Sequence, residues 1–414
     1  MDLATEEQPS SRRLIRTLAR HWKRLFGSGL ALFLVGSWAW WALQLWGLPD
    51  IGDPFDVASF LSVRVADDRN AFIDYSYAAS LHKGINRKFQ ANNTVYNLLD
   101  VPVDWAHANP TWRDYLAQST ETLRLWRLGA EKPEALYDHP GSLSFRTSLE
   151  LSQELRSMSR LAVVEGMRLE AEGDVAAAWG WYRAVLRSSR HSGQHGFQIE
   201  RLVGATIYDD ASKALNRWAT NPKVDAALLR RALDELIAID AMTVTPSETI
   251  KTEYLLFVAE LDDPFLIDDL MITNLPADQP NDWCQDLPIS VGNKKVIQGT
   301  RLSLAQDRER SLRLARLMTA NWLAEVEKPP SQRSKVFREV PTIYEVDPPG
   351  SQALSAEKLS EWLDSSLLAI KHFRWLKNYV VVIDRERVRQ AKLVENLANE
   401  LSKREHGQLP RSPD

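Results

Sequence analysis

Apolar residues recur at intervals of three and four along most of the chain after residue 110, which is the spacing of one face of a helix. The pattern is clearest from Pro110, where Asn109 can cap a helix that has proline in its first turn. The apolar positions that follow are Trp112, Tyr115, Leu116, Leu123 and Trp126. These positions predict helix throughout this segment.

Similar spacing marks further segments, which are separated by glycine, proline or polar turns. Ahead of Pro110, residues 71–82 are expected to form a helix. Later helices are expected at about 147–172, 174–190, 197–219, 224–239, 245–261, 303–326 and 355–404. The spacing of Thr245 and Glu248 fits a capping box, while the β-branched run at 380–383 leaves open whether 355–404 is one helix or two. No segment alternates as strands do, so the predicted fold class is all-α, a helical-hairpin or bundle domain with irregular loops.

A different pattern fills residues 25–48, which carry no formal charge and few polar side chains. As a helix they would extend roughly 36 Å, enough to cross a hydrocarbon core of about 30 Å. The sequence therefore predicts one N-terminal transmembrane helix. The residues expected to anchor it are Leu25, Leu30, Phe33, Trp38, Trp41, Trp46 and Leu48.

The charges around this span predict its orientation. The basic residues before it are Arg12, Arg13, Arg16, Arg20, Lys23 and Arg24. Positive flanks stay in the cytoplasm, so a single-pass signal-anchor in the cell (inner) membrane is expected, with the bulk extracytoplasmic or periplasmic. A cleaved signal peptide is the alternative, but the apolar run is long and ends in WGLPD. Residues 12–24 are either an amphipathic helix on the inner leaflet or simply the positive flank.

These patterns divide the chain into segments. They are a cytoplasmic basic tail at 1–24, a transmembrane helix at 25–48, a membrane-proximal mixed segment at 49–110, a helical domain at 111–261, an acidic proline-rich loop at 262–302, C-terminal helices at 303–405 and a tail at 406–414. The composition is globular, and the net charge of −4 excludes a basic nucleic-acid surface. Cys284 is the one cysteine, so no intramolecular disulfide can form.

The acidic loop is a candidate interaction surface. Residues 262–293 contain seven Asp and no Lys or Arg. Its paired acids are Asp262, Asp263, Asp268 and Asp269. They lack the glycine and distal glutamate of a calcium loop, which favours an exposed, solvated segment. Another acidic pair, Asp209-Asp210, lies in an apolar helix near Arg201 and Arg217, and a helix-surface ion pair is expected there.

His191 and His195 are a second candidate set of metal ligands. Their i, i+4 spacing could place two imidazoles on one metal, with Glu200 as a third ligand. Gly193 lies between them and the helix-borne glutamate of a zinc protease is missing, so a turn with surface or capping histidines is favoured over a metal site. No phosphate loop, nucleophile elbow or dinucleotide motif occurs, and no cofactor is expected.

Two resemblances add to this interpretation. EGMRLEAEGDVAAAWGWYRAVL resembles one tetratricopeptide helical hairpin, at about 157–190, with a Gly173-Asp174 turn and Tyr182 in the packing face. Arg190 occupies the terminal proline position, and the repeat does not continue in register. The ending ANELSKREHGQLPRSPD resembles a segment of bacterial proteins with pseudopilin-like or periplasmic helical ends, in which a long helix stops at a glycine turn followed by proline. The layout of the whole chain resembles uncharacterised membrane-anchored helical proteins of planctomycete-type bacteria, which implies location and helical class but no activity.

Three functions remain open. A non-enzymatic, membrane-tethered scaffold or protein-interaction module with unidentified protein partners is expected first, and it predicts an apolar or aromatic groove without buried titratable clusters. A membrane-anchored enzyme, such as a metal-dependent hydrolase using His191 and His195, predicts two converging rings beside a pocket. An accessory subunit of an envelope complex would contact its partners through 262–293 or through the anchor.

Overall fold

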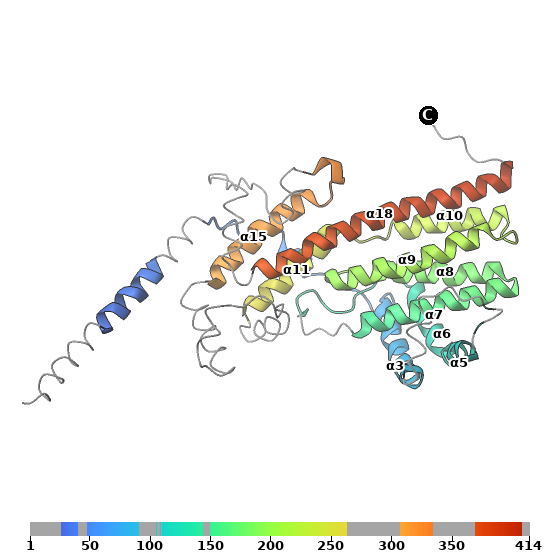
Figure 1. Ribbon diagram of the computed structural model, residues 1–414, viewed down its shortest axis with the longest axis horizontal. Helices are drawn as coiled ribbons and strands as arrows, with labels where there is room; N and C mark the ends of the chain where they lie inside the picture. Colours follow the sequence, from blue (N-terminus) through green and yellow to red (C-terminus); the bar gives the residue numbers. More distant parts are fainter. Residues whose placement is uncertain are drawn as a thin grey trace, which may run out of the picture. The chain divides into compact units, whose positions relative to one another are not determined.

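The computed structural model describes residues 26–39, 48–90, 105, 108, 110–143, 150–262, 307–333 and 369–407. Within these ranges every regular element is a helix, and the β-type pairing is limited to an isolated bridge between Asn70 and Glu134 (Figure 1). The predicted all-α class is therefore confirmed for the described residues.

The chain divides into two compact units. One comprises Met1–Ile51 with Pro264–Leu314, and the other comprises Gly52–Asp263 with Ala315–Asp414. We call the second unit the helical domain. The main helices are α3 (Ala71–Gln90), α5 (Pro110–Gln118), α6 (Thr120–Glu131), α7 (Glu150–Glu172), α8 (Val175–His191), α9 (Gln198–Thr220), α10 (Ala226–Asp240), α11 (Pro246–Asp262), α15 (Asp307–Glu325) and α18 (Ala369–His406). Two short elements, α2 (Val57–Phe60) and the 3₁₀ turn η2 (Pro330–Gln332), complete the set.

The first unit contains the described part of the predicted transmembrane span. Residues 26–39 are helical, while residues 25 and 40–47 lie outside the described residues, as does the basic tail at 1–24. Among the described helices, none combines the length and the apolar composition that crossing a membrane requires. The large apolar side chains of 26–39 are exposed, from 46% for Leu34 to 73% for Leu32. In the same unit, Arg313 donates from Nη1 to the Leu48 carbonyl oxygen at 3.0 Å.

Two predicted segments differ from the expectation, and a third question that the sequence left open is decided within the described residues. The segment from Pro110 is two helices, because the chain turns at the buried Ser119 between α5 and α6. Helix α3 continues beyond residue 82 to Gln90, because Phe89 near its end is buried against the Tyr115 ring. The β-branched run at 380–383 lies inside the single helix α18, where Val380 and Ile383 are buried three positions apart.

The helical domain is built on packed helical hairpins. In Figure 1, α7, α8, α9 and α10 lie side by side, and α18 runs along α9 and α10. Helices α7 and α8 meet at the predicted turn, where Gly173 has a φ of +92° and Asp174 accepts a 2.9 Å hydrogen bond from the Ala177 N–H. Gly166 lets the two helices approach, because a Cβ there would lie 2.5 Å from the Tyr182 ring. The hairpin therefore forms where expected, while the tetratricopeptide resemblance itself stays a prediction.

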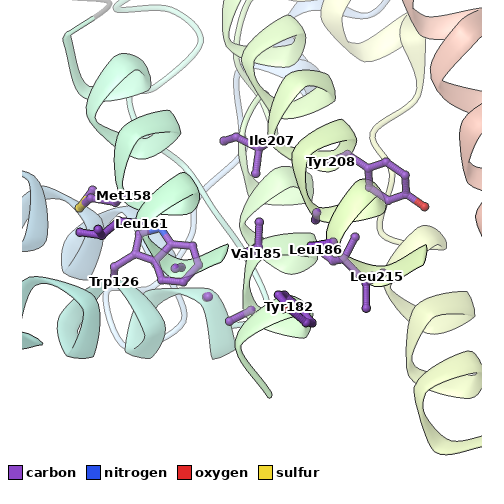
Figure 2. Close-up of a cluster of buried hydrophobic side chains, with 14 of the residues drawn as sticks. Trp126, Met158, Leu161, Tyr182, Val185, Leu186, Ile207, Tyr208 and Leu215 are labelled. Carbon is purple, nitrogen blue, oxygen red and sulfur yellow. The ribbon is translucent and has the colours of Figure 1, made fainter. Parts of the chain in front are cut away.

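One continuous hydrophobic core joins these hairpins to α3 and α6. Figure 2 shows Trp126, Met158 and Leu161 to the left of Val185, Ile207 above it, and Tyr208 and Leu215 to its right. Trp179 and Trp218 stack at a centroid distance of 5.6 Å elsewhere in the same core. Burying side chains of this size contributes on the order of 2–3 kcal/mol each, which is enough to fix α8 at the centre of the domain.

The crossing of α8 and α9 depends on Gly204. A Cβ at this position would lie 2.5 Å from the Ser189 carbonyl oxygen and 2.9 Å from that of Ser192, and backbone cannot rotate away. In Gly204→Ala, the overlap with these carbonyl oxygens should lower the free energy of unfolding by about 3 kcal/mol. The higher helix propensity of alanine should offset about 1 kcal/mol of this loss. We therefore expect urea unfolding to show a net loss of about 2 kcal/mol.

Gly84→Ala is the matched control for this substitution. Gly84 lies within α3 and a Cβ there would have no atom within 4 Å. The same helix-propensity gain, without the overlap, should raise the urea midpoint slightly. A Gly204→Ala variant that is as stable as Gly84→Ala would show that α8 and α9 can separate at no cost.

Candidate functional site

The two histidines that the sequence suggests as metal ligands have separate partners. His191 ends α8, is completely buried, and its Nδ1 lies 2.8 Å from the Tyr75 hydroxyl on α3. Burial, together with the nearby Arg187 charge, lowers the pKa of His191 to about 3. His195 lies in the following turn with a φ of +55°, and its Nδ1 is 2.8 Å from Glu248 on α11.

The proposed third ligand is also engaged elsewhere. Glu200 accepts a hydrogen bond from the Phe197 N–H at 3.2 Å, at the start of α9. Within the described ranges, no three His, Cys, Asp or Glu side chains are grouped as metal ligands. Glu248 accepts from the His195 backbone N–H at 3.0 Å, so its carboxylate joins α11 to the α8–α9 turn. The geometry thus gives the hydrolase hypothesis no converging pair of rings.

A buried ionic cluster joins four helices of the domain. We call Arg190, Arg201, Asp240 and Glu386 the arginine–carboxylate cluster. The two oxygens of Glu386 accept from Arg190 and Arg201 at 2.6 Å each, and Asp240 accepts from Arg190 at 2.8 Å. Arg190 also lies over the Tyr208 ring, with its guanidinium carbon 4.1 Å from the ring centroid. The cluster is almost completely enclosed, so it holds α8, α9, α10 and α18 together rather than meeting a ligand.

Two further carboxyl groups are buried near the start of α9. Glu253 on α11 accepts from the Gln198 N–H at 2.6 Å. Burial raises the pKa of Glu253 to about 7, and it raises the pKa of Glu200 to a similar value. The scaffold hypothesis expects a fold without buried titratable clusters, and this expectation is wrong, because the arginine–carboxylate cluster, Glu200 and Glu253 are all buried.

A chain of polar groups lies between α3, α5 and α7. His82 is buried, with its Nδ1 against a Glu154 oxygen and its Nε2 2.8 Å from the Tyr115 hydroxyl. The order carboxylate, imidazole, hydroxyl is one that could relay a proton. Tyr115 is only 2% exposed and lines neither of the two hollows described below, and its contacts with His82 join α3 to α5, while Glu154 joins His82 to α7.

Among the described residues, two surface hollows that flank α8 are accessible candidate sites. The first, here called the tryptophan hollow, encloses about 310 Å³. It is lined by Trp105, Arg113, Leu116, Ala117, Thr120, Leu123, Glu165, Arg168 and Trp181. The second, here called the arginine hollow, encloses about 270 Å³. It is lined by Arg127, Ala176, Ala177, Trp179, Gly180, Arg183, Arg231 and Glu235.

The hollows were missed in the sequence because each draws residues from three or more elements. Trp181 and Gly180 are adjacent in α8 yet line different hollows, and Arg127 from α6 lies over the Trp181 ring at 4.7 Å. The unusually high tryptophan content was visible, but it gave no indication of which rings are accessible.

The other predicted site residues have mixed outcomes. Asp209 and Asp210 form helix-surface ion pairs as expected, but with Lys213, Arg389 and Arg160 rather than with Arg201 or Arg217. Those two arginines bind carboxylates elsewhere, Arg201 at Glu386 and Arg217 at Glu170. Asp262 is the last residue of α11, while Asp263, Asp268, Asp269 and the remainder of the predicted acidic loop lie outside the described residues.

Comparison with the models of known protein families, with curated proteins and with solved structures found no match to this chain.

Proposed function

We propose that this protein is a membrane-tethered helical scaffold or interaction module. The apolar segment that begins at residue 25 and contains the helix at 26–39 anchors it, with the N-terminus in the cytoplasm and the helical domain on the other side; Leu48, expected as the last anchor residue, is instead a buried bend. The observation that carries the proposal is the helix at 26–39, whose large apolar side chains are all exposed. An exposed apolar surface of this kind, in which Ser28 and Ser37 are the polar side chains, is unfavourable in water and is stabilised in a bilayer.

Two further features support the proposal. Six basic residues precede the anchor, and positive flanks are retained in the cytoplasm. The helical domain offers two accessible hollows on one rigid set of hairpins, while its acid–base groups at His82, His191 and Glu386 are enclosed. Such a surface suits partner binding, which needs a shaped and accessible face, more than catalysis, which needs a reactive group within reach of substrate.

Membrane fractionation of the full chain tests the anchor. We expect the protein to stay in the membrane pellet after alkaline extraction. Phe33→Arg/Val35→Arg should release it, because each central arginine costs about 2.5–3.5 kcal/mol of insertion free energy. The matched control is Leu128→Arg/Ile237→Arg, which alters exposed apolar residues of the helical domain and should leave the protein in the pellet.

Reporter fusions after Asp414 test the orientation. A C-terminal alkaline phosphatase, which is active only outside the cytoplasm, should be active, and a fluorescent reporter that matures only inside should be dark. Release of the unaltered chain by alkali would disprove the anchor. Retention with an inactive phosphatase and a bright fluorescent reporter would disprove the orientation alone.

A further inference from the structure

The arginine hollow contains more positive charge than its carboxylates compensate. It opens on the surface of the helical domain between α6, α8 and α10, and its charged lining is Arg127, Arg183, Arg231 and Glu235. Arg183 donates to Glu131 and lies 3.8 Å from Glu235, whose other oxygen accepts from Trp179 Nε1 at 2.8 Å. The charge of Arg183 is therefore matched by carboxylates.

The other two arginines are not matched in this way. In the part of the chain that the structure describes, neither Arg127 nor Arg231 has a carboxylate within ion-pair distance. Arg230, the neighbour of Arg231 on α10, instead pairs with Glu405 on α18. Two guanidinium charges thus remain uncompensated in one concave space.

The position of Arg127 is fixed before any ligand binds. Its guanidinium carbon lies 4.7 Å from the centroid of the Trp181 ring, a cation–π contact that favours this position of the group. Gly180 provides the space, because a Cβ there would lie 2.9 Å from Arg127 Nη2. Ala176 and Ala177 continue this small-residue surface along α8. Fixing a donor group in advance reduces the entropy lost on binding.

We propose that the arginine hollow binds a tetrahedral dianion of the phosphate class. The N–H groups of a guanidinium match the oxygens of phosphate in spacing and direction, and two uncompensated charges match a dianion. The tryptophan hollow lacks this property, because Arg168 there is held by both Glu165 and Glu172. This site goes beyond the proposed scaffold function, since it does not depend on the membrane anchor.

Calorimetric titration of the full chain in mild detergent with inorganic phosphate tests the site. Saturable binding of one phosphate per chain is expected. Arg231→Gln and Arg127→Gln should each weaken it about tenfold or more, since each removes a charge-assisted hydrogen-bond donor. Arg230→Gln is the matched control and should leave the affinity unchanged, because Arg230 lies outside the hollow.

Further titrations identify the source of the phosphate group. Glycerol 3-phosphate represents a small soluble ester, and phosphatidic acid in the micelle represents a lipid headgroup. The ligand that binds more tightly indicates the natural class.

Acetate should bind at least tenfold more weakly than phosphate. The proposal would be overturned if phosphate did not bind saturably, or if Arg231→Gln bound phosphate as tightly as the unaltered chain. It would also be overturned if the unaltered chain bound acetate as tightly as phosphate. Melting temperatures check that the variants are folded. If Arg127→Gln does not fold, the Arg231→Gln variant still tests the site, because Arg231 is exposed and its replacement should leave the fold intact.

Discussion

Replacing Glu386 with alanine should lower the free energy of unfolding of the helical domain by about 3–5 kcal/mol, because it leaves buried charges without a partner. Glu386 is 1% exposed and each of its oxygens holds a different guanidinium, Arg190 on α8 and Arg201 on α9. The arginines are 196 and 185 positions away in the sequence, so one carboxylate joins the C-terminal helix to the centre of the domain.

The two arginines are not equally affected by this loss. Arg190 keeps its 2.8 Å bond to Asp240 and its place over the Tyr208 ring. Within the described residues, Glu386 is the carboxylate that pairs with Arg201, and Nε and Nη1 of Arg201 are buried with no hydrogen-bond partner among these residues. Most of the destabilisation should therefore come from the uncompensated charge of Arg201.

Urea unfolding of the full chain measures the effect, and two variants show its cause. Glu386→Gln keeps the shape and one acceptor, so its loss should be intermediate. Arg201→Leu/Glu386→Leu removes the buried, unpaired charge of Arg201 together with its partner. This double variant should be less destabilised than Glu386→Ala, because replacing a whole buried ion pair by apolar residues often costs little stability. Glu395→Ala alters an exposed residue on the same helix and should change stability by less than about 0.5 kcal/mol. A Glu386→Ala loss within that limit would contradict the electrostatic interpretation of the cluster.

The helices could be predicted from the sequence because their signals are local. The turn at Gly173-Asp174 and the end of α18 lie where glycine and the capping residue indicate, with Gly407 at a φ of +68°. The break at Ser119 could not be predicted, since its cause is the packing of two short helices in the core. The long α3 was underestimated because its last residues are polar except for Ile85 and Phe89.

The pairing of charges could not be predicted because it depends on tertiary structure. Arg201 lies eight positions from Asp209, yet it binds Glu386 on α18, and Arg389 from that helix binds Asp209. In the same way, His191 and His195 are close in sequence but have their partners on α3 and α11. Spacing along a helix gives the face on which a residue lies, whereas the partner is set by which helix packs there.

Glu253→Gln should stabilise the protein at pH 8 and have little effect near pH 4. Burial raises the pKa of Glu253 from 4.5 to about 7 in the folded chain, so the folded state binds a proton more tightly than the unfolded state does. Stability then falls as pH rises from 4.5 through 7, because the folded protein must bury a carboxylate. A shift of this size corresponds to about 3 kcal/mol at pH 8, which glutamine removes while it still accepts from the Gln198 N–H.

The measurement is the urea midpoint of both chains between pH 4 and pH 8. Their difference should be small at pH 4, grow between pH 4.5 and 7, and stay constant above that range. Glu200 has a similarly raised pKa and His191 a lowered one, but both are present in the two chains, so they largely cancel in the difference. Glu121→Gln is the control of opposite sign, because the hydrogen bond from Arg124 lowers the pKa of that exposed carboxyl. A pH-independent difference for Glu253→Gln would mean that this carboxyl ionises as readily in the folded chain as in the unfolded one.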